Sequence, residues 1–401
     1  MKCVILAAGE GKRMHPLTFT RPKVMLPIAN KPILEWNLLN AKNAGLKEFI
    51  FVIGYKSEMV RDYFGDGDKW NVKIEYVNQG EPRGTGHAIN MVQKFVDNFI
   101  VLCGDTIFGA QDIKKFIPKK SSIGIVEVKH PDEYGIVETK ENKLIKIYEK
   151  MDEPFSNVIN AGVYHFNKNI FDYIKQTTKS PRGEYEITDS INMLVTDKTM
   201  ETIILQEWRD IVFPWHLLDA NEELLKNIVK KIDGTVEKHI TLKGNIIIGK
   251  NTTIMAGSYI KGPVVIGNDC KIGPNCYIRP YTSIGDKCHI GNACEIKNSI
   301  IMDETNVPHH NYVGDSIIGQ NCNLGSGTKI ANLRLDKKNI KVVLNGKKID
   351  TKRKKLGTII GDNVQTGINS TINIGTTIGN NVFIGPGAIV KGEIRPGSTI
   401  L

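Results

Sequence analysis

Two short segments near the start of the chain carry residue types that bind phosphate. Residues 6–14 read LAAGEGKRM, in which small residues let a backbone loop approach a phosphate and Arg13 supplies positive charge. Residues 21–27 read RPKVMLP and place Lys23 between two prolines that stiffen its loop. A surface lysine is usually a solvated charge. On a rigid loop beside a glycine turn, however, Lys23 is a candidate phosphate clamp.

The elements around these segments predict an α/β domain. Strand-like runs at 3–7, 49–53 and 99–103 alternate with a helix-like run at 32–44, an order typical of a mostly parallel sheet. Chemistry should then lie at the carboxyl edge of the sheet, where the glycine loop begins. The glycine pattern is not a dinucleotide fingerprint, because Met14 stands where a third glycine is needed. It is not a P-loop either, because Gly-Lys-Ser/Thr is missing.

Together the two segments resemble the signature of sugar-1-phosphate nucleotidylyltransferases, and later motifs follow in that family's order. The resemblance implies that Arg13, Lys23 and Asp105 are catalytic, and that Asp105 also binds a metal. It implies nucleotide binding at Leu6, Ala8, Gly9, Gln79, Gly84 and Thr85. It implies sugar binding at Gly135, Glu149 and Asn160, within the motifs Tyr134-Gly135, Glu149-Lys150 and Asn160-Ala161-Gly162.

The second metal ligand that the resemblance implies is Asp210, in the segment Trp208-Arg209-Asp210. The family usually continues with Ile-Gly, whereas this chain continues with IVFP. Two carboxylates can hold Mg²⁺, which bridges phosphate oxygens and keeps some of its waters. In the implied reaction, a sugar phosphate oxygen attacks the α-phosphorus of UTP or another nucleoside triphosphate in line, and pyrophosphate leaves. Lys23 and Arg13 would stabilise the crowded charge.

The second half of the chain carries a six-residue repeat. Nine isoleucines stand six residues apart, at Ile248, Ile254, Ile260, Ile266, Ile272, Ile278, Ile284, Ile290 and Ile296. This period fits a parallel β-helix of hexapeptides, in which one aliphatic side chain per face points inward. The spacing returns at Ile318, Leu324 and Ile330, then at Ile360, Ile372, Ile378, Ile384 and Val390. The repeat therefore predicts one solenoid over residues 241–401.

The repeat is interrupted between Met302 and Ile318, which lie sixteen residues apart. We expect four extra residues to bulge out at this point. The interruption contains His309 and His310. Exposed histidines are usually incidental, yet functional residues favour irregular positions on an otherwise regular surface.

From about residue 277 to 390 the chain resembles the acetyltransferase half of bifunctional enzymes that act on glucosamine 1-phosphate. The resemblance implies phosphate binding by Arg279 and Lys297 and a catalytic base at His309, since imidazole titrates near the working pH. It implies roles in sugar binding or acyl transfer for Tyr312, Asn323, Ser326 and Asn332. It also implies acetyl-CoA as a co-substrate, a left-handed β-helix, and a homotrimer with the acetyl site between subunits.

Positive charge is concentrated in one short segment. The net charge of the chain is +10, and residues 337–355 hold nine lysines or arginines against one acid, Asp350. The remainder is nearly neutral, so a nucleic-acid footprint over the whole protein is unsupported. The segment could be a solvated excursion from the β-helix, a phosphate-binding patch for a substrate or coenzyme, or a nucleic-acid contact.

The length of 401 residues is too great for one core. The change in periodicity predicts a Rossmann-like α/β nucleotidyltransferase domain over 1–225, a linker helix over 226–240 and the β-helix over 241–401. The seven cysteines are odd in number and lie partly in the repeat, so we expect reduced thiols. The sequence has no membrane-span or signal-peptide pattern, which favours a cytoplasmic protein with small-molecule substrates and no nucleic-acid or membrane partner.

These observations favour a bifunctional enzyme that acetylates glucosamine 1-phosphate and forms UDP-N-acetylglucosamine. One alternative keeps only nucleotidyl transfer, with UTP, dTTP or GTP, and treats the β-helix as a structural module. A second alternative is a non-catalytic sensor of nucleotide sugars. The presence of Arg13, Lys23 and Asp105 argues against a sensor, which need not keep the catalytic charges.

Overall fold

The computed structural model describes residues 1–149, 151 and 153–401. The chain divides into two compact units, each built from segments that are distant in sequence. The first unit comprises Met1–Glu10, Pro22–Met25 and Ile33–Asp210, and the second comprises Gly11–Arg21, Leu26–Pro32 and Ile211–Leu401. The phosphate-binding signature therefore contributes to both units, which the predicted domain boundary at residue 225 did not anticipate.

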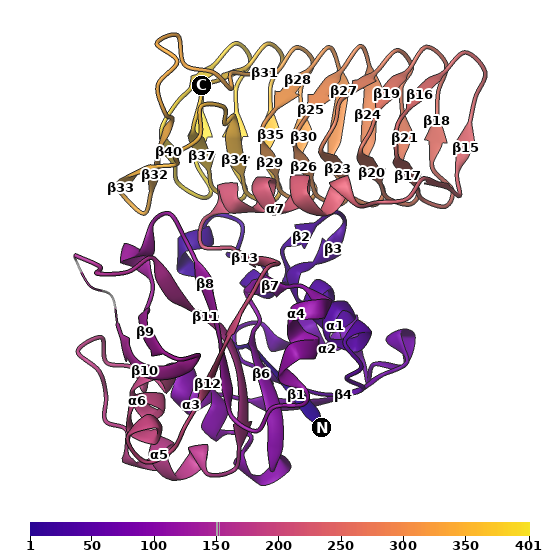
Figure 1. Cartoon of the computed structure of the whole chain (residues 1–401). Coiled ribbons are helices and arrows are strands. Elements are labelled where there is room, and N and C mark those ends of the chain that lie inside the picture. Colours follow the sequence, from indigo (N-terminus) through magenta and orange to yellow (C-terminus); the bar gives the residue numbers. More distant parts are fainter. Residues whose placement is uncertain (150, 152) are drawn as a thin grey trace. The chain divides into compact units, whose positions relative to one another are not determined.

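The first unit is a mixed β-sheet with helices on both faces (Figure 1). Its strands run in the order β5-β4-β1-β6-β11-β8-β12-β10-β9. Their bounds are β1 Lys2–Ala7, β4 Glu48–Ile53, β5 Lys73–Asn78, β6 Asn98–Cys103, β8 Ser122–Glu127, β9 Ile136–Lys140, β10 Lys143–Tyr148, β11 Val158–Asn167 and β12 Glu201–Ile204. The strands β5, β4, β1 and β6 are parallel, as predicted, whereas β11 runs antiparallel to both β6 and β8.

Alternate residues of each strand face opposite helical layers, because side chains alternate along a strand. Cys3 and Ile5 of β1 pack in one core cluster, and Val4 between them packs in the other. The helix predicted at 32–44 is α1, and its residues Leu34 and Leu38 are buried as expected. The helices of this unit are α1 Ile33–Asn43, α2 Ser57–Phe64, α3 Thr85–Asn90, α4 Ala110–Phe116, α5 Ile170–Gln176 and α6 Ile187–Asp197.

The second unit contains a left-handed parallel β-helix, in which each regular coil adds one strand to each of three sheets (Figure 1). The first sheet holds β14 Lys231–Ile232, β17 Ile246–Ile248, β20 Val264–Ile266, β23 Thr282–Ile284, β26 Ile300–Ile301, β29 Ile317–Ile318, β34 Thr358–Ile360, β37 Thr376–Ile378 and β40 Glu393–Ile394. The second holds β15 Thr235–Val236, β18 Thr253–Ile254, β21 Lys271–Ile272, β24 His289–Asn292, β27 Asn306–His309, β30 Asn323–Leu324, β35 Gln365–Thr366, β38 Phe383–Ile384 and β41 Thr399–Ile400. The third holds β16 Thr241–Lys243, β19 Tyr259–Lys261, β22 Tyr277–Ile278, β25 Glu295–Lys297, β28 Tyr312–Gly314, β31 Lys329–Ile330, β36 Thr371–Ile372 and β39 Ile389–Val390.

The predicted aliphatic stack forms the core of this β-helix, and five of the cysteines lie in it as free thiols. The predicted bulge of four residues is wrong. The stack continues from Ile296 through Ile301, Val307 and Val313 to Ile318, so residues 303–317 form ordinary coil strands. Two faces are one residue short instead. The prediction failed for two reasons. A count of six residues led from Ile296 to Met302, whereas the buried residue is Ile301. The next two buried positions are valines, so the isoleucine pattern was lost.

The true departure from the repeat follows β31. The basic segment forms an antiparallel hairpin of β32 (Lys341–Leu344) and β33 (Lys347–Asp350) before the coil resumes at β34. Ile340 and Val342 are buried, so the hairpin packs on the unit. This arrangement supports an ordered excursion from the β-helix.

The linker helix predicted over 226–240 is also wrong. The helix is α7 (Pro214–Lys226), and the first coil strand already begins at Lys231. Pro214 stands in the first turn, where its missing N–H costs nothing. Asn221 of α7 exchanges hydrogen bonds with Tyr281 O, at 2.9 Å, and Ser283 Oγ, at 2.6 Å, so this helix is part of the β-helix unit. None of the described helices is long and apolar enough to cross a membrane.

Candidate functional site

The first candidate site forms where β6 ends and brings Lys23 and Asp105 together. Lys23 begins a short 3-10 helix, η2 (Lys23–Met25), and Asp105 lies between β6 and β7 (Thr106–Phe108). Lys23 Nζ donates a hydrogen bond to Asp105 Oδ2 at 2.7 Å. The side chain of Lys23 is 10% exposed and that of Asp105 is 44% exposed. The pair therefore holds an ammonium group in place beside a carboxylate that a ligand can reach.

Asp210 joins this pair from a separate strand. Strand β13 (Trp208–Asp210) pairs antiparallel with β7, which puts Asp210 opposite Thr106. Thr106 Oγ1 donates to Asp210 Oδ1 at 3.4 Å. Burial raises the pKa of the Cys103 thiol, the negative charges of Asp105 and Asp210 raise it further, and the charge of Lys23 opposes them. All three predicted charges therefore act on the same thiol.

The carboxylates of Asp105 and Asp210 suit a hard cation. Mg²⁺ prefers oxygen ligands and usually keeps several waters beside one or two carboxylates and substrate phosphates. The raised pKa of the Cys103 thiol disfavours its thiolate form. The described residues contain no group of three or more His, Cys, Asp or Glu side chains that could hold a metal.

Strand β1 ends in an open backbone loop beside this site. Gly104 N–H donates to Leu6 O at 2.9 Å, which joins the ends of β1 and β6. A Cβ at Gly54 would lie 2.8 Å from Ala8 O, so the neighbouring strand end needs glycine. A Cβ at Gly9 would meet nothing within 4 Å. The backbone at Gly9 is therefore accessible, as the approach of a triphosphate requires.

The segment predicted to read the nucleobase is held by its own hydrogen bonds. Gln79 is 7% exposed, and its Nε2 donates to Gly84 O at 3.2 Å. Gly84 has a φ of 103°, and a Cβ there would lie 2.5 Å from Tyr185 O. Thr85 Oγ1 accepts the N–H of Ile187 at 3.1 Å. Gln79, Gly84 and Thr85 thus lie together, and only glycine fits the middle position.

The predicted sugar-binding residues also lie together. Asn160 N–H donates to Gly135 O at 2.9 Å. A Cβ at Gly135 would lie 3.4 Å from Glu149 Oε1, and the Glu149 side chain is 30% exposed. Lys150, part of the same motif, lies outside the described residues.

Sequence reasoning missed the partners of Glu149. Thr188 Oγ1 donates to Glu149 Oε1 at 2.8 Å, and Arg182 Nη2 donates to Glu149 Oε2 at 3.2 Å. Arg182 also pairs with Glu186 at 2.8 Å. Burial raises the pKa of Glu186, and the charge of Arg182 opposes that rise. The Pro181-Arg182-Gly183 turn before α6 was the only signal that could have pointed to this loop.

Arg13 belongs to the second unit. It lies in the short 3-10 helix η1 (Lys12–Met14), and its guanidinium lies 6.0 Å from the centroid of the Phe213 ring. Phe213 is part of the IVFP sequence that departs from the expected Ile-Gly. A residue of the sequence that differs from the family pattern, Phe213, therefore contacts Arg13.

The second candidate site is a basic cavity of about 470 Å³ on the β-helix. Its lining residues are Glu222, Arg279, Pro280, Tyr281, Lys297, Asn298, Asp315, Arg353, Lys354 and Lys355. Arg279 Nη1 donates to Glu295 Oε1 at 2.8 Å, and Arg353 pairs with Asp219 of α7. Three residues that follow the hairpin thus line the same cavity as the two predicted phosphate ligands, Arg279 and Lys297.

One buried carboxylate that the sequence did not single out organises this cavity. Asp315 is 2% exposed, and its Oδ2 accepts from Lys297 Nζ at 2.8 Å and from Asn332 Nδ2 at 2.5 Å. Asn332 Nδ2 also donates to Tyr312 Oη at 3.1 Å. Asp315 Oδ1 accepts from Asn298 at 2.8 Å. The predicted Lys297, Tyr312 and Asn332 therefore share an acceptor network.

His309, Asn323 and Ser326 lie on neighbouring coils and are not among the residues that line the basic cavity. His309 ends β27 with an exposed side chain, and its backbone O accepts the N–H of Gly327 at 3.0 Å. Asn323 pairs with Asn306 at the start of β27. Burial lowers the pKa of neighbouring His289, and the proximity of His309 lowers it further. His309 and His289 therefore lie near each other on consecutive coils.

Comparison with known proteins matches both halves of the chain. Residues 2–227 match a family profile described as Nucleotidyl transferase, and residues 260–375 match one described as GMPPB C-terminal domain. The chain is 45% identical over 405 residues to "Bifunctional protein GlmU" of Methanococcus maripaludis, with 100% of this chain and 97% of that protein covered. It is 41% identical to "Bifunctional sugar-1-phosphate nucleotidylyltransferase/acetyltransferase" of Sulfurisphaera tokodaii, with 99% of each covered.

The chain belongs to the family of bifunctional sugar-1-phosphate nucleotidylyltransferase/acetyltransferases. A solved Bacillus anthracis structure described as a glucose-1-phosphate thymidylyltransferase covers 58% of this chain and 97% of its own, at 28% identity and a TM-score of 0.53. These findings confirm the predicted family and its two transferase halves.

The two candidate sites lie in different units of the chain. The charges of Lys23, Asp105 and Asp210 gather in the first unit, and a basic cavity that includes Arg279 and Lys297 lies in the second. The rival hypothesis of a non-catalytic sensor has no support in the names of these relatives.

Proposed function

We propose that the enzyme acetylates glucosamine 1-phosphate with acetyl-CoA and transfers UMP from UTP to the acetylated sugar, giving UDP-N-acetylglucosamine and pyrophosphate. The observation that carries the proposal is the presence of two distinct phosphate-type sites on one chain. One is the Lys23–Asp105 pair at the edge of the sheet, and the other is the basic cavity lined by Arg279, Lys297 and Lys355. Each of the two sites would bind a sugar phosphate.

In the nucleotidyl transfer, the protein supplies position and charge. The open backbone at Gly9 would receive the triphosphate, and Lys23 and Arg13 would stabilise charge as the phosphates crowd together. Asp105 and Asp210 would hold Mg²⁺, which neutralises and orients phosphate oxygens when bound. Gly135, Glu149 and Asn160 would orient the sugar, so that its phosphate oxygen attacks in line.

In the acetyl transfer, the amine nitrogen of the sugar attacks the thioester carbon, the carbon–sulfur bond breaks and coenzyme A leaves. His309 is the proposed base that accepts the proton of the amine. Asn323 and the backbone amides around Ser326 would donate to the oxyanion. Arg279 and Lys297 would hold the sugar phosphate, and the network around Asp315 would fix Lys297, Tyr312 and Asn332.

The basic residues after the hairpin belong to the same proposal. Arg353, Lys354 and Lys355 line the cavity, and the exposed lysines of β33 precede them on the hairpin. This position favours the phosphate-binding interpretation of the basic segment for these three residues. A sugar phosphate in the cavity, or a phosphate of acetyl-CoA at its mouth, would meet their charge.

We also propose a homotrimer that works in the cytoplasm, where nucleoside triphosphates and acetyl-CoA are available. Ile368, Phe383 and Ile389 are exposed by 56%, 51% and 74% on the last regular coils of the β-helix. Large apolar side chains exposed on a regular surface often mark a contact with another subunit.

Mass spectrometry of the products tests the proposed reactions. The enzyme would be incubated with glucosamine 1-phosphate, acetyl-CoA, Mg²⁺ and each of UTP, dTTP and GTP. We expect free coenzyme A, and UDP-N-acetylglucosamine with UTP. Nucleotide sugar without consumption of acetyl-CoA would support the alternative of nucleotidyl transfer alone. In a parallel incubation with mannose 1-phosphate in place of glucosamine 1-phosphate, product with GTP would support a guanylyltransferase.

A further inference from the structure

One corner of the β-helix repeats a single hydrogen bond from coil to coil. Residues at this corner accept, with Oδ1, the backbone N–H of the corner residue one coil earlier. The distances are 2.9 Å for Asn268, 2.7 Å for Asp286, 2.8 Å for Asp303, 2.8 Å for Asp362 and 3.1 Å for Asn380. Asparagine occupies this position as readily as aspartate, so the ladder needs an oxygen and no charge.

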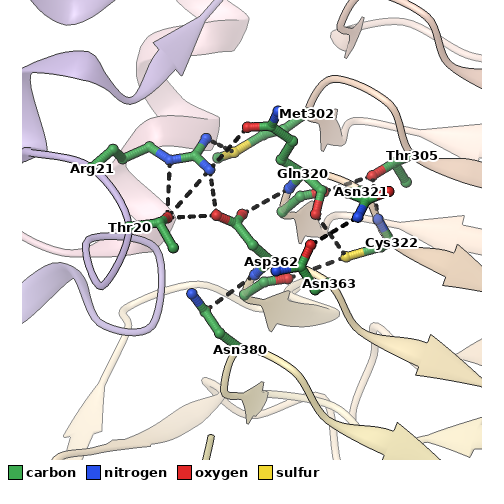
Figure 2. Close-up of polar contacts among 12 residues, drawn as sticks. Thr20, Arg21, Met302, Thr305, Gln320, Asn321, Cys322, Asp362, Asn363 and Asn380 are labelled. Carbon is green, nitrogen blue, oxygen red and sulfur yellow. Dashed lines mark hydrogen bonds and ion pairs between the residues drawn. The ribbon is translucent and has the colours of Figure 1, made fainter. Parts of the chain in front are cut away.

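Asp362 differs from the other members in what its second oxygen does (Figure 2). Asp362 Oδ2 accepts from Thr20 Oγ1 at 2.5 Å and forms an ion pair with Arg21. Arg21 also donates to Gln320 Oε1 at 3.3 Å and to the sulfur of Met302 at 3.2 Å. The β-helix thus surrounds one arginine of the N-terminal signature with acceptors from three successive coils.

This ion pair is buried on both sides. The side chains of Arg21 and Asp362 are 10% and 7% exposed. Removing one partner of a buried pair leaves the other charge uncompensated, which is strongly unfavourable. The pair joins residues 341 positions apart, and it holds residues 11–21 within the β-helix unit.

The held segment carries residues of the proposed nucleotidyl transfer. Arg13 lies within it, and Lys23 follows Arg21 after one intervening residue, Pro22. The proline ring fixes its own φ and restricts the backbone of Arg21. The placement of Arg21 therefore sets where the chain enters the turn that carries Lys23, with little freedom between them.

We propose that Asp362 and Arg21 are positioning residues for nucleotidyl transfer, so that the β-helix is required for the activity of the other half. Neither residue needs to touch the substrate. The proposal rests on the proposed nucleotidyl transfer and adds a specific dependence of that reaction on one carboxylate of the β-helix. A displacement of about 1 Å in a positioned group can cost about 10²-fold in rate.

The test uses the full chain and compares Asp362→Asn with Asp286→Asn. Both variants keep the ladder oxygen and remove one charge, but only Asp362 contacts Arg21. We expect Asp362→Asn to lower kcat of nucleotidyl transfer by about 10- to 100-fold while the KM values change by less than about threefold. Acetyl transfer and the circular-dichroism spectrum should stay near those of the wild type, and Asp286→Asn should keep both activities.

A double-mutant cycle sharpens the assignment. Arg21→Gln should reduce kcat about as much as Asp362→Asn, and the double variant should lose little more, because the two residues act through one contact. An unchanged kcat in Asp362→Asn would overturn the proposal. So would an equal loss in Asp286→Asn, or a loss that affects both activities and the folded spectrum together. Failure of the wild type to make any nucleotide sugar would refute the proposed function itself.

Discussion

At the residue scale, the charge of Lys23 is held in a fixed place. Its ammonium is held 2.7 Å from Asp105, and its side chain is 10% exposed. A group held in this way stabilises charge that develops at a fixed point, so it should contribute more in the transition state than in the bound substrate.

Lys23→Ala should therefore lower kcat of nucleotidyl transfer by about 10²- to 10³-fold, with a smaller change in the KM for sugar phosphate. Steady-state kinetics with pyrophosphate release as the readout would separate the two constants. Acetyl transfer by the same preparation is the control for folding. A variant with normal kcat and only a raised KM would remove Lys23 from the catalytic set.

The two adjacent histidines provide a second prediction at this scale. His309 lies at the end of β27, whereas His310 occupies the corner with a φ of 52° and donates its backbone N–H to Asn292 O at 3.0 Å. His309→Ala should cut acetyl transfer by about 10²- to 10⁴-fold, the usual contribution of a positioned base. His310→Ala should cost far less, because its observed contacts are made by the backbone.

Formation of coenzyme A, followed with a thiol reagent, would measure both histidine variants. Nucleotidyl transfer should be normal in each. The opposite ranking would move the catalytic position by one residue. If neither variant affected acetyl transfer, the second activity would be wrongly assigned.

At the element scale, Asp315 links three successive strands of one β-helix face. Lys297 of β25 and Asn332, which follows β31, both donate to the buried carboxylate of Asp315, and Asn332 also donates to Tyr312 of β28. Such a network should contribute more to stability than any single exposed ion pair, because its buried members cannot form replacement hydrogen bonds with water.

Asp315→Asn should lower the free energy of unfolding by about 3 kcal/mol, since it leaves the Lys297 ammonium without its carboxylate. Acetyl transfer should fall by at least about tenfold, because Lys297 and Asn332 lose the carboxylate oxygen that both donate to, and Tyr312 is held through Asn332. Thermal unfolding and acetyl kinetics would measure the two effects. The matched control is Asp336→Asn, which breaks the exposed Arg334–Asp336 pair and should leave both unchanged. Equal effects in the two variants would contradict the special role of Asp315.

At the scale of the whole molecule, the exposed apolar residues of the last coils bear on assembly. Ile389 is 74% exposed and Phe383 is 51% exposed, although both belong to strands of the β-helix. We expect light scattering to give a mass of three times the 44.7 kDa chain.

Replacing Phe383 and Ile389 together by aspartate should convert the trimer to monomers and abolish acetyl transfer, if that site lies between subunits. Ile204→Asp is the matched control, because Ile204 is 65% exposed on β12 of the first unit. That variant should remain trimeric. A fully active monomer would contradict an intersubunit acetyl site.

Local patterns in the sequence determined most of the architecture. The six-residue spacing of isoleucines predicted the β-helix core, because each face buries one aliphatic side chain whatever its neighbours are. The order of apolar runs predicted the parallel strands β1, β4 and β6. Motif resemblance named Lys23 and Asp105, which the structure brings into contact. Each of these signals is carried by a few neighbouring residues or repeats at a fixed interval along the chain.

Only the tertiary structure revealed the features that depend on distant pairing. Asp315 is an ordinary corner aspartate in the sequence, and its importance comes from side chains on neighbouring coils. Asp362 occupies a repeated position that asparagine also fills. Its negative charge is used only because Arg21, from a distant part of the chain, forms an ion pair with it. The shorter face that ends at Ile301 could not be recognised in the sequence for a related reason. Strand pairing between coils accommodates a face with one residue fewer, whereas a fixed count of six along the chain does not. The periodicity of the sequence determines which side chains are buried. Contacts between distant segments determine which charged side chains pair with one another.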